Sequence, residues 1–160
     1  MDHISVDDGN RRENVLKGRI ENSRFELTTP VYNLTIYELG EILGFIDGAD
    51  LGVFKEPFPH ITLSTSYGEM TFFDIEKGWL EHKIEIDIFS IRCVFADGLK
   101  LSPESMLAFN EKCKENDILL RDGDRYIFQA SLRIMPKDNV LRLLERLLDM
   151  SGRCEELSSG

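Results

Sequence analysis

The sequence predicts an α+β fold, a two-layer sandwich in which helices lie on one face of a five-stranded antiparallel sheet. Three observations lead to this prediction. Short runs of alternating apolar and polar residues are typical of strands, and the turn sequences at Tyr67–Gly68 and Asp122–Gly123 are typical of hairpins. Apolar residues also recur at helical spacing before, between and after these strands. The expected order of elements is therefore α-β-β-β-α-β-β-α.

The first helix is expected to begin after a cap at Thr28 or Thr29 and to end at Gly48. Pro30 fits its first turn, because the ring fixes φ and the missing N–H has no helical partner there. The first hairpin follows, with strands over residues 60–65 and 70–76.

The third strand is expected over residues 83–95. Its apolar residues occupy every second position up to Ile88, and from Phe89 onward they occupy the alternate set of positions. Either a β-bulge near Phe89–Ser90 resets the register, or the second half of the strand is covered on both faces. A helix capped by Ser102 follows, with Pro103 in its first position. Its inward stripe is expected to consist of Met106, Phe109, Asn110 and Cys113.

The second hairpin joins strands over residues 117–120 and 125–134, and a final helix is expected over 137–150. The last strand has a clean alternation, so one face should meet the core and the other should meet solvent. Its expected core residues are Tyr126, Phe128, Ala130, Leu132 and Ile134, and its expected outer residues are Ile127, Gln129, Ser131 and Arg133.

The chain divides by composition into three parts. Residues 1–27 form a polar, partly disordered extension, residues 28–150 a single α+β domain, and residues 151–160 a flexible tail.

Charge and cysteine content restrict the function classes. The formal net charge of −10 argues against binding to nucleic acid or to an anionic membrane. No apolar run is long enough to span a bilayer, and the start of the chain lacks the pattern of a signal peptide. Cys93, Cys113 and Cys154 lack the short spacings of metal knuckles or redox dithiols. We therefore expect a cytoplasmic protein with reduced thiols, no metal and no cofactor.

The final helix has the most informative surface. Its apolar residues cover an arc of about 180°, whereas a helix that covers one sheet face needs roughly 100°. Either the first helix covers the excess within one chain, or a partner or second subunit does. Trp79, in a polar loop, is a further candidate for an interface. The candidate interface residues are Val140, Arg142, Leu143, Arg146, Leu147, Met150 and Trp79.

Glu85 and Asp87 alternate on one face of the third strand. Paired carboxylates can run acid–base chemistry, but a solvated strand face is the simpler interpretation, because the sequence places no His, Ser or metal ligand beside them. The Asp-Gly sequences near Asp47 and Asp122 are typical of turns and lack the acidic run of a calcium loop.

The order of elements, read with the segment Leu101–Ile134, resembles the YbjN-type family of bacterial sensory-transduction regulators, which is similar in fold to type III secretion chaperones. Asn110 on its helix and Asp122–Gly123 at its turn carry the resemblance. It implies a dimerising or protein-binding module and supplies no catalytic residues.

Two function classes follow. The first is a non-enzymatic regulator or chaperone-like protein that binds a polypeptide, or forms a homodimer, through an apolar helix and sheet surface. The second is a small enzyme with an acidic site around Glu85 and Asp87. An apolar groove would favour the first class, and a pocket with several convergent titratable groups would favour the second.

Overall fold

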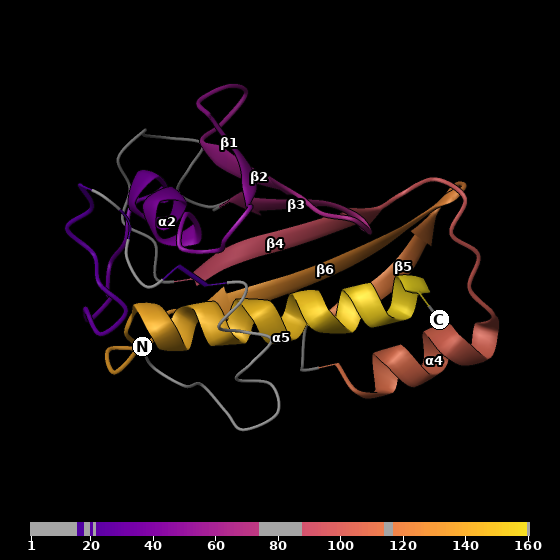
Figure 1. Ribbon diagram of the computed structural model, residues 1–160. Coiled ribbons are helices and arrows are strands. Elements are labelled where there is room, and N and C mark those ends of the chain that lie inside the picture. The colour runs from indigo at the N-terminus through magenta and orange to yellow at the C-terminus, as the bar shows by residue number, and fades with distance from the viewer. Residues whose placement is uncertain (1–15, 18–19, 21, 74–87, 114–116, 160) are drawn as a thin grey trace.

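The computed structural model describes residues 16–17, 20, 22–73, 88–113 and 117–159 (Figure 1). Three helices and six strands lie within these ranges. The helices are α2 (Ile36–Leu43), α4 (Pro103–Glu111) and α5 (Val140–Ser159). The strands are β1 (Asp50–Phe54), β2 (His60–Ser64), β3 (Gly68–Phe73), β4 (Ile88–Phe95), β5 (Ile118–Asp122) and β6 (Arg125–Arg133).

The strands form one antiparallel sheet in the order β1-β2-β3-β4-β6-β5. The chain is therefore α+β, but the prediction of five strands is wrong. The missed strand is β1, which pairs along its whole length with β2 at an edge of the sheet. Its five residues include Gly52 and are largely exposed, so they carry no alternating apolar pattern.

The helices pack on one face of the sheet, and α5 runs along that face beneath β4 and β6 (Figure 1). Phe109 of α4 meets Phe128 of β6 edge-on, with ring centroids 5.4 Å apart. The predicted core phase of β6 is confirmed, because Phe128 is fully buried and Gln129 is exposed. Ile127 is also buried, so its assignment to a solvent-facing position is wrong.

The described part of β4 alternates regularly. Phe89, Ile91, Cys93 and Phe95 face the core. Ile88 is 37% exposed and faces away. The bulge expected near Phe89–Ser90 is wrong, because residues 88–94 pair one-to-one with β6 through these two positions. Residues 84–87, whose apolar phase suggested it, lie outside the described residues.

The first helix is shorter than expected at both ends, because its cap is Thr35 instead of Thr28 or Thr29 and its C-cap is Gly44 instead of Gly48. The Thr35 hydroxyl accepts from the Glu38 amide and the Glu38 carboxylate accepts from the Thr35 amide, which is a capping box. The preceding residues are not helical, since the Val31 amide donates to Asp138 and Thr29 accepts from the Val140 amide. The second helix has the predicted cap, Ser102, and the predicted proline in its first turn.

The final helix is longer than expected and ends at Ser159 instead of Met150. Cys154 is fully buried on its inner face, so residues 151–159 are a packed helix and not a polar tail. At the other end of the chain, Leu16 and Phe25 are buried in the core, so part of the N-terminal extension packs on the domain. No helix in the described part of the chain is long and apolar enough to cross a membrane.

Candidate functional site

The apolar candidates for an interface on α5 lie in the core of the single chain. Their exposed fractions are 0% for Val140 and Leu143, 4% for Leu147 and 5% for Met150. The sheet and α2 contribute to the same apolar cluster. Of the two alternatives left by the sequence, the chain itself covers this arc, and the prediction that these four side chains face a partner is wrong.

The two arginines of the predicted interface differ. Arg142 is exposed on α5. Arg146 donates to the buried carboxylate of Asp138 at 2.8 Å and to the carbonyl oxygen of Arg133 at 2.8 Å. Arg146 therefore stabilises the connection between β6 and α5. Trp79, Glu85 and Asp87, predicted from the sequence, lie outside the described residues.

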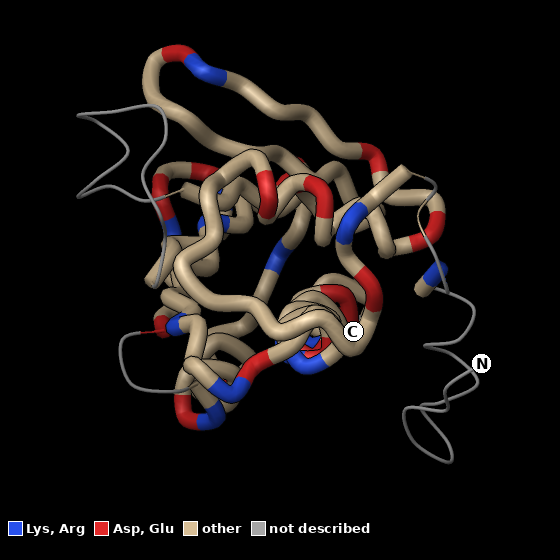
Figure 2. Tube along the Cα trace, turned by 90° about the vertical axis from the view of Figure 1, so that its left-hand side faces the viewer, with Lys and Arg blue, Asp and Glu red and all other residues tan. Residues whose placement is uncertain are grey.

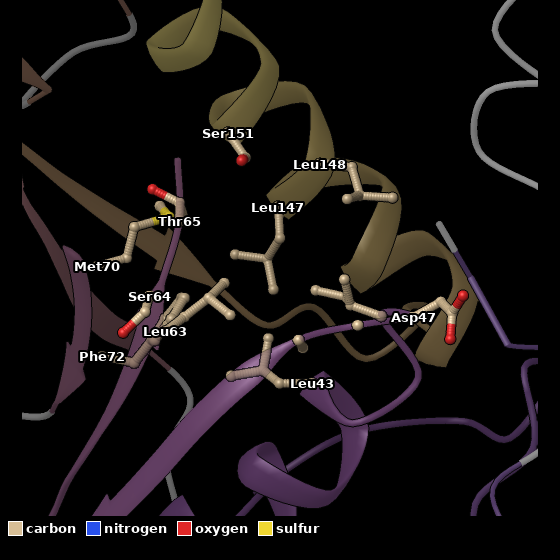
Figure 3. A pocket seen from close by; sticks show the side chains of 13 residues that line it. Leu43, Asp47, Leu63, Ser64, Thr65, Met70, Phe72, Leu147, Leu148 and Ser151 are labelled. Carbon is tan, nitrogen blue, oxygen red and sulfur yellow. The ribbon is translucent and has the colours of Figure 1, made fainter. Parts of the chain in front are cut away.

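A pocket of about 160 Å³ opens beside α5, between the end of α2, the following turn, and strands β2 and β3 (Figure 3). Its apolar walls come from segments far apart in the sequence. They are formed by Leu43, Ile46, Leu63, Met70, Phe72, Leu147 and Leu148. Its polar and small lining residues are Asp47, Gly48, Ala49, Ser64, Thr65 and Ser151.

Two of the hydroxyl groups around the pocket, those of Thr65 and Ser151, already have partners. The Ser151 hydroxyl shares a hydrogen bond of 2.5 Å with the Tyr67 hydroxyl, and the Thr65 hydroxyl donates to the Gly68 carbonyl. Asp47 is exposed and carries the one carboxylate among the described lining residues. Because acid–base chemistry needs groups that converge on a reacting atom, this lining is suited to binding.

Behind the pocket wall lies a buried cluster of hydroxyl and thiol groups that sequence reasoning missed. Burial raises the pKa of Tyr67 well above its usual value, despite the hydrogen bond with Ser151. The pKa of Cys154 is also raised, most strongly by a hydrogen bond with Cys93 and next by burial. The sequence places Tyr67 in a hairpin turn, Cys93 on an apolar strand face, and Ser151 and Cys154 in the tail, so no spacing indicated that they meet.

Metal ligands do not gather in this part of the fold. Among the described residues, no group of three or more His, Cys, Asp or Glu side chains could hold a metal ion.

Comparison with known proteins gives no match: neither a protein-family model, nor a curated protein, nor a solved structure is similar to this chain. The resemblance to YbjN-type regulators therefore stays a prediction.

Proposed function

We propose that this protein is a non-enzymatic module that binds a polypeptide by taking one apolar side chain of that polypeptide into the pocket beside α5. The observation that carries the proposal is the apolar lining of a pocket of about 160 Å³. An engineered apolar cavity of about 150 Å³ holds benzene. A phenylalanine ring or a leucine side chain is of that size, so a single anchor residue fits.

The opening of the pocket favours an extended or flexible partner. The turn after α2, with Asp47, Gly48 and Ala49, lies on one side, and Leu148 and Ser151 of α5 lie on the other. Binding of this kind depends on one desolvated anchor, surrounded by contacts that exclude water.

Charge favours basic residues next to the anchor. Asp47 is exposed at the pocket, and the chain carries a net charge of −10. Along the backbone trace of the described residues, acidic and basic positions are interspersed (Figure 2). Lysine or arginine beside the anchor would be attracted to Asp47 and to the overall field.

The cellular role belongs to the same proposal. Cytoplasmic location is supported by cysteines that are free in the structure, and a regulatory or chaperone-like role is supported by the resemblance in sequence. The alternative, an acidic enzyme site at Glu85 and Asp87, concerns residues outside the described part of the chain.

The proposal can be tested with an array of synthetic decapeptides, each with one central phenylalanine, leucine or alanine between lysines or between glutamates. We expect binding to phenylalanine or leucine peptides with lysine neighbours. Calorimetry should then show that Ala49→Leu, which adds volume inside the pocket, weakens the best peptide at least about tenfold. Ala108→Leu, on the exposed face of α4, is the matched control and should bind as the unchanged protein does.

A second pair of variants tests the charge. Asp47→Asn should weaken binding of the lysine peptides several-fold at low salt, and the exposed Glu155→Gln should have little effect. If no peptide binds, or if Ala49→Leu and Ala108→Leu bind equally well, the pocket is not the binding site.

A further inference from the structure

Two thiols from distant parts of the chain meet in the core. Cys93 lies on the core face of β4, and Cys154 lies on the inner face of α5, although they are roughly 60 residues apart in sequence. Both side chains are fully buried. The spacing of the cysteines in the sequence predicted no paired role for them. Sequence spacing cannot show which strand a helix covers, so it could not reveal that these two cysteines meet.

Hydrogen bonds and strand register fix this arrangement independently of the thiols. Met70 of β3 is the direct cross-strand partner of Cys93. The Tyr67 hydroxyl contacts the Met70 sulfur at 3.4 Å and the Ser151 hydroxyl at 2.5 Å. Ser151 lies one turn before Cys154, on the same side of α5. The sheet and the helix are therefore held together beside both thiols.

The thiols of Cys93 and Cys154 also hydrogen-bond with each other. Together with the register of Cys93 beside Met70 and the Tyr67–Ser151 hydrogen bond, this contact brings the two thiols together in the core. Both cysteines are free in the structure.

We propose that Cys93 and Cys154 are a site of reversible oxidation, and that a peroxide converts them into an intramolecular disulfide that links α5 to β4. In the first step a thiolate attacks hydrogen peroxide, the O–O bond breaks, and a sulfenic acid and hydroxide form. In the second step the other thiol attacks the sulfenic sulfur, and water leaves. Overall the two thiols lose two hydrogen atoms and the peroxide becomes two molecules of water.

Burial makes the reaction slow at neutral pH. Oxidation proceeds through the thiolate, and the pKa of Cys154 is raised, so little thiolate is present in the closed fold. Peroxide reaches the pair when the last turns of α5 open. The rate should therefore increase with pH and with mild destabilisation of α5.

Cys113 provides an internal comparison. It follows α4 and is partly buried, and burial raises its pKa as well. Because it lies closer to solvent, it would react first if exposure alone decided the outcome. The proposal requires instead that Cys113 stays unlinked while Cys93 and Cys154 pair.

The test is to treat the full chain with hydrogen peroxide between pH 7 and pH 9, block remaining thiols with an alkylating reagent, and map peptides by mass spectrometry without reduction. We expect one peptide pair joined through Cys93 and Cys154, and Cys113 alkylated. Cys93→Ser and Cys154→Ser should abolish the link, and Cys113→Ser should retain it. The oxidised protein should melt about 5–10 °C higher, and reduction should reverse this shift.

Three outcomes would overturn the proposal. They are a link through Cys113, links only between molecules, or irreversible oxidation of Cys93 and Cys154 without a link. Because the peptide map uses the unchanged protein, this result does not depend on whether the serine variants fold.

Discussion

The side chain of Asn110 completes the hydrogen bonding of the outer edge of β5. Its amide nitrogen donates to the Leu119 carbonyl at 3.0 Å, and its oxygen accepts from the Leu119 amide at 2.8 Å. In an antiparallel strand, the amide and the carbonyl of one residue point to the same side. The Asn110 side chain pairs with both of these groups of Leu119, so it takes the place that a further strand would occupy. Natural sheets commonly protect their edges in this way. The sequence placed Asn110 correctly on a helix but gave no indication of this partner.

Replacing Asn110 should therefore destabilise the protein through β5. Asn110→Ala leaves the amide and carbonyl of Leu119 without these bonds, and we expect a loss of about 1–3 kcal/mol in unfolding free energy. Glu111→Ala, at the exposed neighbouring position, should stay within about 0.5 kcal/mol. Urea unfolding measures both values. Equal effects would show that the Asn110 bonds contribute nothing.

At the scale of elements, β1 and the end of α5 show where local patterns are insufficient. The Phe54 ring lies over Gly52, where a Cβ atom would be 2.7 Å from the ring, and it stacks on His60 with centroids 5.0 Å apart. Pairing with β2 and this stacking hold β1 in place, and neither contact appears in the pattern of the strand itself. The end of α5 similarly has a polar composition, yet Cys154 is fully buried there and Leu157 packs against the core.

The inner face of α5 gives the prediction at this scale. Leu143 is fully buried, so Leu143→Ala should lower the unfolding free energy by about 2–5 kcal/mol. Arg142→Ala, at the exposed neighbouring position, should stay within about 0.5 kcal/mol. Denaturation and light scattering should be measured together. If Leu143→Ala keeps the stability and lowers the mass in solution, the helix faces a partner and is not core.

For the whole molecule, the sequence predicted elements better than it predicted the site. Turn residues and apolar spacing are local signals. They could therefore predict both hairpins, the helix cap at Ser102 and the core phase of β6. The pocket could not, because Leu43, Leu63 and Leu147 come from three elements whose docking depends on tertiary packing. The predicted interface failed for the same reason: a wide apolar arc does not reveal how many neighbours cover it.

Buried protonated groups predict how the stability of the whole molecule depends on pH. The pKa values of Cys154 and Tyr67 are raised, so the folded protein keeps protons that the unfolded chain releases near about 8.5 and 10. The unfolded state then binds fewer protons, and the unfolding free energy should fall as pH rises above about 8.5. Urea unfolding between pH 7 and pH 10.5 measures this slope. Cys154→Ala and Tyr67→Phe should flatten it, and an unchanged slope in both variants would contradict the account.

The central claim is that the pocket beside α5 receives an apolar anchor from a polypeptide. Methyl NMR of the full chain, titrated with the best phenylalanine–lysine peptide, tests it most directly, because Leu43, Leu63, Met70 and Leu147 line the walls. We predict that the largest shift changes occur at these methyl groups and disappear when alanine replaces the phenylalanine of the peptide. Shift changes centred instead on the exposed residues Val53 and Ile118, or no saturable change at any methyl group, would contradict the claim.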